Sequence, residues 1–376
     1  MPTHNGKLLL SLSTTPILLL AIGCGGGMSQ AVSTTTVTPT PVASPTPADS
    51  IYVFQDNDAF SPPQPSSILR FPKASVGPAT PASTITGPAN VIFQALAEDA
   101  SGNLYVGANT YNASPNTGPG GVDLLVYALG SAGTSAPTRT IAGSATGLQN
   151  LSSNPIASLD VDSAGNLFVA ADVVVGPNGP GGRIVDGISV FSPSANGNVP
   201  PSRVIAGDQT AMSGAIPQIA VTPAGGVYVG VNAYQTPGSI LFFPPTATGN
   251  IAPTTVLGGP LTTIVNISGV AIDSAGNIYV ASTTLPTTND IHTEVPSILV
   301  FAAGSTGNVA PTRTISGSAA DFGFIHNLRV DSTGNIYVLS GSEILKFTSS
   351  ANGNVAPASA ITSAAYFEPI GSLALQ

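Results

Sequence analysis

The stretch DSAGNIYVAS at residues 273–282 occurs four times in this chain with small changes. The other copies are DASGNLYVGA (99–108), DSAGNLFVAA (162–171) and DSTGNIYVLS (331–340). A degenerate copy, TPAGGVYVGV, begins at Thr222, so successive copies start 51 to 63 residues apart. Internal repeats of this length predict an architecture built from stacked or circularly arranged units.

Each repeat predicts a small antiparallel sheet. In the Asp-x-x-Gly-Asn segment the Asp can cap N–H groups two residues later and the Gly supplies a positive φ, which predicts a tight turn. Alternating β-branched and aromatic residues on both sides predict two strands. Segments such as SILVFAAGSTGNVAPTRTISG (297–317) predict a second pair. Such a sheet cannot bury both faces alone, so we expect the sheets to pack around an axis as a β-propeller.

The two ends of the repeat region predict how the ring closes. ADSIYVFQ (48–55) supplies a second strand without a first, and IGSLAL (370–375) supplies a first strand without a second. We therefore expect an all-β, six-bladed β-propeller of four-stranded antiparallel blades, with the first blade closed by the C-terminal strand. The expected blades are 51–87 with 369–376, 91–143, 155–207, 215–259, 266–317 and 324–363.

The segment before the propeller predicts export. Lys7 and the apolar run after it are typical of a secretory signal peptide, residues 1–23. LAIGC (20–24) resembles a bacterial lipobox, which implies cleavage before Cys24 and lipidation of its thiol; the alternative is an ordinary signal peptide with a chance Cys. Residues 24–48, Gly-rich and then Thr/Pro-rich, predict a disordered tether, followed by the propeller over 49–376. We expect a lipid-anchored protein of the bacterial cell envelope, with the outer membrane favoured because no Asp follows the Cys.

The amino-acid composition limits the classes of molecule that the protein could bind. The chain has 9 Lys and Arg against 18 Asp and Glu, a net charge of −9, and only 7% charged residues. Without a basic stripe, nucleic acid is excluded as a partner and membrane contact is expected through the lipid anchor only. The single Cys excludes an intramolecular disulfide, and we expect a monomer.

The repeats Asp99–Val106, Asp162–Val169, Asp273–Val280 and Asp331–Val338 resemble NHL-type repeats and the related bacterial D-x-x-G-N-x-Y-V propeller repeats. The resemblance covers residues 51–376 and implies the propeller fold. It implies no single activity, because members look like scaffolds, ligand binders, lactonases and lyases. A WD40 propeller is excluded, since the chain has no Trp and its repeat is too long.

The candidate binding site lies at the beginning of the inner strands. Long segments between second and third strands, residues 108–123, 171–187 and 282–296, are expected as loops on the same face. We expect a non-enzymatic binding or scaffold role for this face, with an envelope or extracellular protein or a glycan as ligand and with no cofactor. The polar residues expected there are Gln94, Ser158, Gln218, Ser268, His326, Asn327 and Ser372.

The alternative hypothesis is an extracytoplasmic lactonase- or lyase-like enzyme with His326 and Glu368 as an acid/base pair. A metal-dependent lactonase needs several carboxylates at the axis, and a lyase needs two His residues, whereas His292 falls in a loop. We expect no metal site. The repeated Asp residues come singly and are interpreted as turn caps, and Arg139 and its equivalents Arg203 and Arg313 as solvated or paired with acids.

Overall fold

The computed structural model describes residues 49–55, 65–110, 121–148, 156–176, 183–214, 216, 218–232, 237–284, 295–362 and 370–375. All of them belong to one compact unit, Ser44–Gln376. The predicted signal peptide and the predicted tether with Cys24 lie outside the described residues. No helix in the described ranges is long and apolar enough to cross a membrane.

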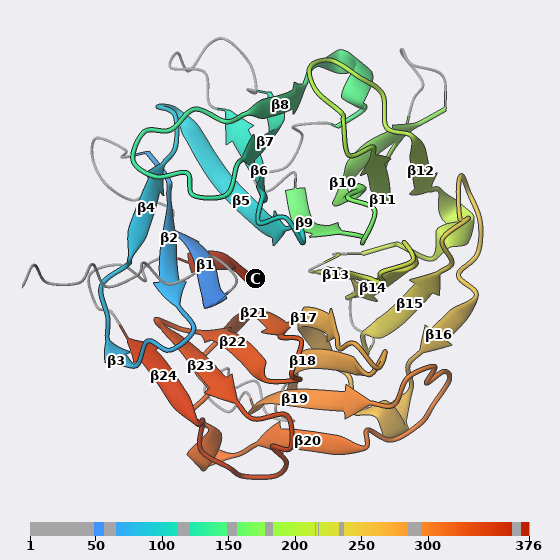
Figure 1. Ribbon diagram of the computed structural model, residues 1–376. Helices are drawn as coiled ribbons and strands as arrows, with labels where there is room; N and C mark the ends of the chain where they lie inside the picture. Colours follow the sequence, from blue (N-terminus) through green and yellow to red (C-terminus); the bar gives the residue numbers. More distant parts are fainter. Residues whose placement is uncertain are drawn as a thin grey trace, which may run out of the picture. The chain divides into compact units, whose positions relative to one another are not determined.

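Six sheets are arranged around a central axis, and each runs from an inner strand to an outer strand at the rim (Figure 1). We number these blades in chain order and give their strands from the axis outward. Blade 1 holds β25 (Ile370–Leu375), β1 (Ser50–Gln55), β2 (Ser67–Pro72) and β4 (Ser83–Thr86). Blade 2 holds β5 (Val91–Glu98), β6 (Leu104–Thr110), β7 (Val122–Tyr127) and β8 (Arg139–Ala142). Blade 3 holds β9 (Ile156–Val161), β10 (Leu167–Val175), β11 (Arg183–Phe191) and β12 (Arg203–Ala206).

The other three blades follow the same plan. Blade 4 holds β13 (Ile219–Val221), β14 (Val227–Val231), β15 (Ser239–Phe243) and β16 (Thr255–Leu257). Blade 5 holds β17 (Asn266–Ile272), β18 (Ile278–Thr284), β19 (Val295–Phe301) and β20 (Arg313–Ser316). Blade 6 holds β21 (Ile325–Val330), β22 (Ile336–Ser340), β23 (Glu343–Phe347) and β24 (Ser359–Thr362). Short 3-10 helices follow four of the outer strands: η2 (Ser144–Thr146), η3 (Asp208–Thr210), η4 (Pro260–Thr262) and η6 (Ser318–Ala320). The predicted six-bladed, all-β propeller is confirmed.

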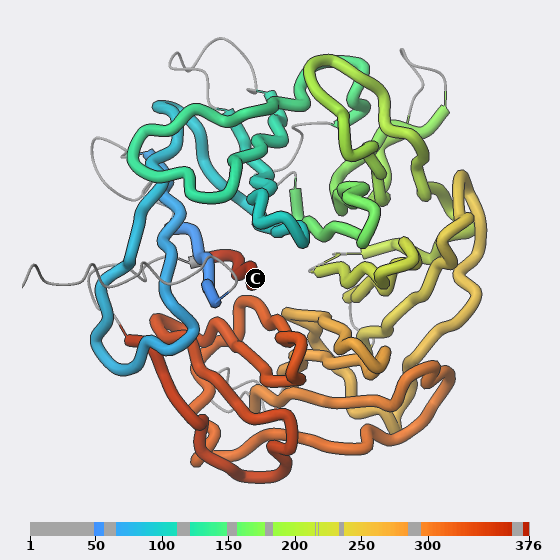
Figure 2. The backbone as a smooth tube through the Cα atoms, in the orientation of Figure 1, coloured from blue at the N-terminus to red at the C-terminus, as the bar shows by residue number. Residues whose placement is uncertain are grey.

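The ring closes as the sequence predicts. The C-terminal strand β25 pairs antiparallel with β1, so that Leu373 lies opposite Val53 and Leu375 opposite Ile51. In Figure 2 the blue start and the red end of the chain lie side by side near the axis. The inner strands then contact one another in the cyclic order β25, β5, β9, β13, β17, β21.

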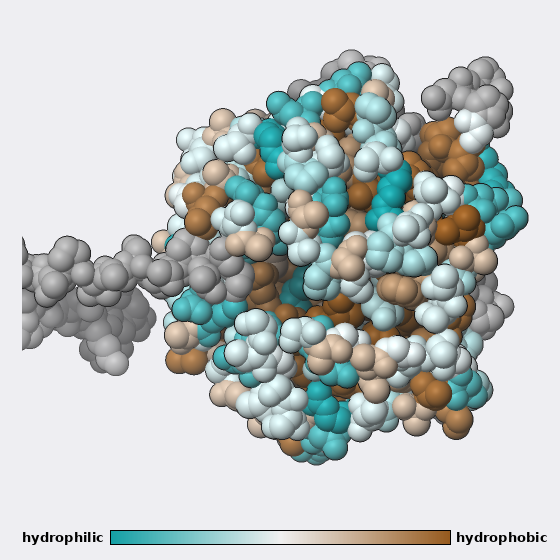
Figure 3. Space-filling model, turned by 45° about the vertical axis from the view of Figure 1, so that its right-hand side comes forward, coloured by the Kyte–Doolittle hydropathy of each residue, from teal (hydrophilic) through white to brown (hydrophobic). Residues whose placement is uncertain are grey.

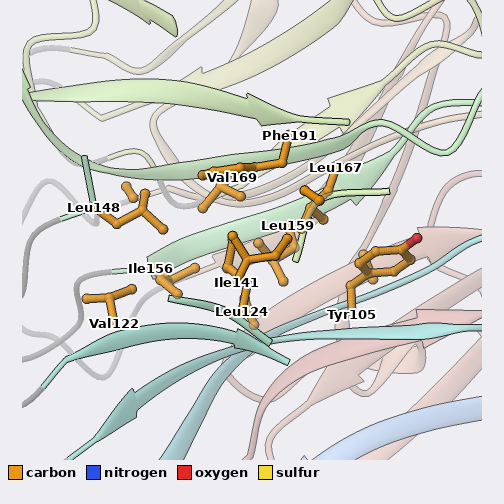
Figure 4. Close-up of a cluster of buried hydrophobic side chains, with 14 of the residues drawn as sticks. Tyr105, Val122, Leu124, Ile141, Leu148, Ile156, Leu159, Leu167, Val169 and Phe191 are labelled. Atoms are coloured by element: carbon orange, nitrogen blue, oxygen red, sulfur yellow. The ribbon is translucent and has the colours of Figure 1, made fainter. Parts of the chain in front are cut away.

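The core lies between the blades rather than within one of them. Six clusters of buried hydrophobic side chains occupy the six interfaces between neighbouring blades. Figure 4 shows one of them, where Leu124 and Ile141 of blade 2 meet Leu159 and Val169 of blade 3. Each such fully buried side chain contributes about 1.5–3 kcal/mol, so a blade is stable only with its neighbours in place.

A second contact between blades runs along the outer rim. The loop between the third and fourth strands of each blade pairs in parallel with the outer strand of the blade before it. The pairs are Gly133–Ile85, Gly197–Ile141, Gly249–Ile205, Gly307–Leu257, Gly353–Ile315 and, between β3 (Gly77–Pro78) and β24, Gly77–Ile361. These six contacts explain the repeated Gly-Asn-Val-Ala-Pro segments, which join each blade to the preceding one.

The recurring arginines strengthen the same interfaces, which differs from the sequence-based expectation of solvated or acid-paired side chains. Arg313 donates from Nη1 to the carbonyl of Ala351 in the next blade at 2.8 Å and from Nη2 to the Tyr279 hydroxyl at 3.3 Å. Its guanidinium lies 5.9 Å from the centre of the Tyr279 ring. Arg139 and Arg203 make equivalent contacts, because the neighbouring loop presents carbonyls that a planar guanidinium can satisfy.

Strands extend further into one predicted loop than expected. In blade 3 the register of β10 with β11 continues to Val175 opposite Arg183, so most of the predicted loop 171–187 is a hairpin arm. The β-branched run at 173–175 favours this extension. Residues 177–182, like 111–120 and 285–294 in the other two predicted loops, lie outside the described residues.

Candidate functional site

The predicted site residues lie where the inner strands are irregular. Five of the six inner strands, β25, β5, β9, β17 and β21, change register against the second strand of their blade. Gln94, Ser268 and His326 are the extra residues that the register skips at three of these positions. A β-bulge re-aims a side chain away from its regular direction, so at these three positions a polar side chain can turn toward the axis.

Four predicted site residues form hydrogen bonds between neighbouring inner strands. Ser372 Oγ accepts from the backbone N–H of Leu96 at 3.1 Å, and Gln94 Oε1 accepts from Ile156 at 3.2 Å. The same pattern continues with Ser158 Oγ and Ile219 N at 3.2 Å, and with Gln218 Oε1 and Val270 N at 3.0 Å. These side chains therefore satisfy backbone N–H groups of the next inner strand in the ring.

The side chain of Gln218 also connects two blades that are not neighbours. From blade 4, its Nε2 donates to Oδ1 of Asn327 in blade 6 at 3.2 Å, and its side chain is fully buried. It passes over Gly269 of blade 5, where a Cβ would come within 3.0 Å of Gln218 Oε1. Ser268 beside it has a buried hydroxyl with no hydrogen-bond partner in the described part of the chain. The predicted residues thus converge on the axis, mostly as parts of its packed wall.

Gly269→Ala should destabilise the propeller by about 1–3 kcal/mol, because the added methyl displaces Gln218 and presses on Leu328. Urea denaturation of the purified protein measures this. The matched control is Gly323→Ala, whose new Cβ would meet nothing nearer than 3.7 Å. Equal stability of the two variants would show that the Gln218 contact does not require a residue without a side chain at position 269.

At the loop face, His326 lies beside an exposed aromatic ring. The ring of Phe324 meets His326 edge-on at 4.9 Å between centroids, and the Phe324 side chain is 59% exposed. The backbone here is held by a hydrogen bond from Gly341 N to the Phe324 carbonyl at 2.7 Å. Burial lowers the pKa of His326 below its usual 6.5, so the imidazole is neutral at pH 7. Its predicted partner Glu368, like His292, lies outside the described residues.

Two charged residues near the axis were missed by the sequence analysis. Asp160 on β9 accepts from Val221 N through Oδ2 at 2.6 Å and from Val161 N through Oδ1 at 2.9 Å. Arg329 on β21 donates from Nη1 to Asn327 Oδ1 at 3.3 Å. Both side chains are half-buried. The sequence does contain a signal for them, because a charged residue stands here at a position, two residues before the turn, that is Ala in the other four inner strands. These alanines are Ala97, Ala220, Ala271 and Ala374.

These two charges are near enough to act on each other's ionisation. Desolvation raises the pKa of Asp160, and the positive charge of Arg329 together with the two backbone hydrogen bonds partly offsets that rise. Desolvation lowers the pKa of Arg329, and Asp160 opposes this change. They form no direct ion pair; within the described ranges that contact is made by Arg183 and Asp208.

The repeated turn aspartates act as caps. Asp273 Oδ1 accepts from the N–H groups of Ala275 and Asn277, both at 2.9 Å, and Oδ2 accepts from the Tyr279 hydroxyl at 3.1 Å. Although burial by itself would raise it, these hydrogen bonds hold the pKa of Asp273 below its usual value. The interpretation as turn caps is confirmed. In the part of the chain that the structure describes, no three His, Cys, Asp or Glu side chains are grouped to hold a metal.

Comparison with known proteins supports the repeat and the fold. Residues 254–285 match the family model SBBP, described as a beta-propeller repeat. They cover the end of blade 4 and the first hairpin of blade 5, including one copy of the Asp turn. No curated protein matches the sequence.

Several solved structures align with most of this chain. A protein of unknown function from Bacteroides caccae aligns over 87% of this chain and 98% of its own, with 11% identity and a TM-score of 0.53. A gluconolactonase from Xanthomonas campestris aligns over 69% and 73%, with 15% identity and a TM-score of 0.39. A PQQ-bound aldose sugar dehydrogenase from Streptomyces coelicolor aligns over 75% and 84%, with 12% identity and a TM-score of 0.44. At identities this low, a structural likeness indicates at most the fold and not the activity. The repeats, the six closed sheets and the family model together make this chain a β-propeller repeat protein.

Proposed function

We propose that this protein is a non-enzymatic binding protein of the bacterial cell envelope that binds a neutral glycan at the loop-face end of its inner strands. The observation that carries the proposal is Phe324, whose ring is 59% exposed while its backbone is held by Gly341. A fixed aromatic ring offers an apolar face to the C–H groups of a sugar at little entropic cost. His326 beside it supplies a polar group for sugar hydroxyls.

The charge of the protein favours a neutral ligand. Only 7% of the residues are charged. The face seen in Figure 3 is mostly pale, with separate brown hydrophobic and teal hydrophilic areas rather than a single hydrophobic or hydrophilic patch. Hydrogen bonding, and not charge attraction, would therefore select the ligand.

The chain enters the propeller at the face opposite the long loops. The propeller begins at Ser50, and β1 starts beside the end of β25, where the other blades carry their Asp turns. The predicted tether thus joins the turn face. The loop-bearing face lies at the opposite end of the blades from this attachment point.

Phe324→Ala should weaken glycan binding at least tenfold, because the stacking surface is removed while the fold is kept. Saturation-transfer NMR and calorimetry with neutral cello-, xylo- and malto-oligosaccharides measure the change. Leu261→Ala is the matched control, since Leu261 is also 59% exposed but belongs to η4 at the rim of blade 4. The proposal is overturned if the wild-type protein binds none of these sugars or if both variants lose binding equally.

The alternative is an extracytoplasmic lactonase- or lyase-like enzyme. It is supported by His326, whose lowered pKa leaves a neutral imidazole able to accept a proton at pH 7. Turnover of simple lactones by the wild-type protein, lost in both His326→Ala and Glu368→Gln, would favour catalysis over binding. Sugar binding that depends on Phe324 without such turnover would favour the binding role.

A further inference from the structure

A second group of polar side chains lies at the turn-face end of the inner strands. Asp160 and Arg329 occupy equivalent positions, two residues before the turn, in blades 3 and 6. In a ring of six, these blades are separated by two blades on either side, so the two inner strands face each other across the axis. The equivalent positions of blades 1, 2, 4 and 5 hold alanines that are buried against the neighbouring blades, so none of these four positions contributes a longer side chain near the two charges.

The hydrogen bonds of both residues hold their charged groups against the inner strands. Arg329 Nη1 bonds to the same Asn327 Oδ1 that receives Gln218 Nε2, at 3.3 and 3.2 Å. Asp160 Oδ2 bonds to Val221 N in β13 at 2.6 Å. Each oxygen of Asp160 keeps a free lone pair, and the described contacts of Arg329 use one of its three guanidinium nitrogens.

The two charges are held apart. They act on each other electrostatically without forming a direct ion pair, and both side chains keep partial contact with solvent. Burying opposite charges without letting them meet is costly, and a molecule carrying both charges would relieve that cost at both ends. A ligand carboxylate suits the guanidinium fork, and a ligand ammonium suits the carboxylate.

We propose that the turn-face end of the inner strands binds a small zwitterion of the amino-acid class, with its carboxylate on Arg329 and its ammonium on Asp160. This site is separate from the glycan site at the loop face. It uses none of the residues on which that proposal depends, Phe324 and His326.

Calorimetry on the purified full chain tests the proposal with glycine, β-alanine and γ-aminobutyrate, which separate the two charges by increasing lengths. Acetate and methylammonium, which carry one charge each, are the controls. We expect at least one zwitterion to bind tenfold or more tightly than either single-charge ion. Acetate binding as tightly as the best zwitterion, or no binding by any zwitterion at millimolar concentration, would overturn the proposal.

The double variant Asp160→Ala with Arg329→Ala gives all six inner strands the same small residue, so we expect it to fold and to lose zwitterion binding. Asp160→Asn keeps the shape of the side chain if the double variant is unstable, and it should remove the preference for glycine or its homologues over acetate. Phe324→Ala should leave zwitterion binding unchanged. Unchanged zwitterion binding in both Asp160 variants contradicts the proposal, whatever the outcome with glycans.

Discussion

A chain ending at residue 369 should fail to fold cooperatively. The missing strand β25 carries Leu373 and Ala374, which are 0% and 1% exposed and pack in the interfaces of blade 1 with blades 6 and 2. Their loss opens two interfaces and leaves β1 as an unpaired edge strand with a buried face. Because a whole domain is stable by only about 5–15 kcal/mol, losing one strand and two interfaces exceeds that margin.

Thermal melting followed by circular dichroism, with size-exclusion chromatography, measures this effect. The truncated chain should show a broad or absent transition and self-association. Leu373→Ala in the full chain is the graded control, and it should remain folded with a loss of about 2–5 kcal/mol. A truncated chain that melts within a few degrees of the full chain would contradict closure by β25 as the source of stability.

Glu98→Gln should stabilise the protein at pH 9 and change it little at pH 5. Burial, and next the charge of Asp99, raise the pKa of Glu98 to about 8, while Lys73 and Arg70 act in the opposite direction. Both carboxyl oxygens are buried without a hydrogen-bond partner among the described residues. The folded state therefore holds a proton that the unfolded chain releases above its usual pKa of about 4.5.

The sign of the pH effect follows from that difference. Since the folded pKa lies above the unfolded one, stability falls as the pH rises from about 4.5 through about 8. The neutral amide removes this dependence, so the variant should gain about 2–4 kcal/mol over the wild type at pH 9, allowing for partial contact with solvent. Urea denaturation at pH 5 and pH 9 measures the gain, with Glu343→Gln on β23 as the control. Parallel pH dependence of wild type and Glu98→Gln would show that Glu98 is ionised in the folded state.

The local features of the fold could be read from the sequence because they depend on neighbours in the chain. The Asp turns bind their own backbone within four residues, as Asp273 does with Ala275 and Asn277. The aromatic residues after the turns, Tyr279 among them, alternate with apolar neighbours and are buried between blades. Ring closure could also be predicted from the sequence. The repeat region begins with a second strand that lacks its first strand and ends with a first strand that lacks its second, so the two complete one blade.

The interactions between blades could not be read in the same way. Arg313 was assigned to solvent because its partners, Ala351 and the Tyr279 hydroxyl, come from other segments. The polar residues of the inner strands were recognised as a set, but the bond from Gln218 to Asn327 over Gly269 depends on how far each bulge turns its strand.

By itself the sequence determined the number of blades, their strand order and the residue that closes each turn, because period and turn chemistry are local properties. Only the tertiary structure decided that Asp160 and Arg329, 169 positions apart, face each other near the axis. The physical reason is that closing six blades into a ring places the inner strands of opposite blades on opposite sides of a shared axis. The sequence around Asp160 does not predict that Arg329 lies opposite it, and the sequence around Arg329 does not predict Asp160.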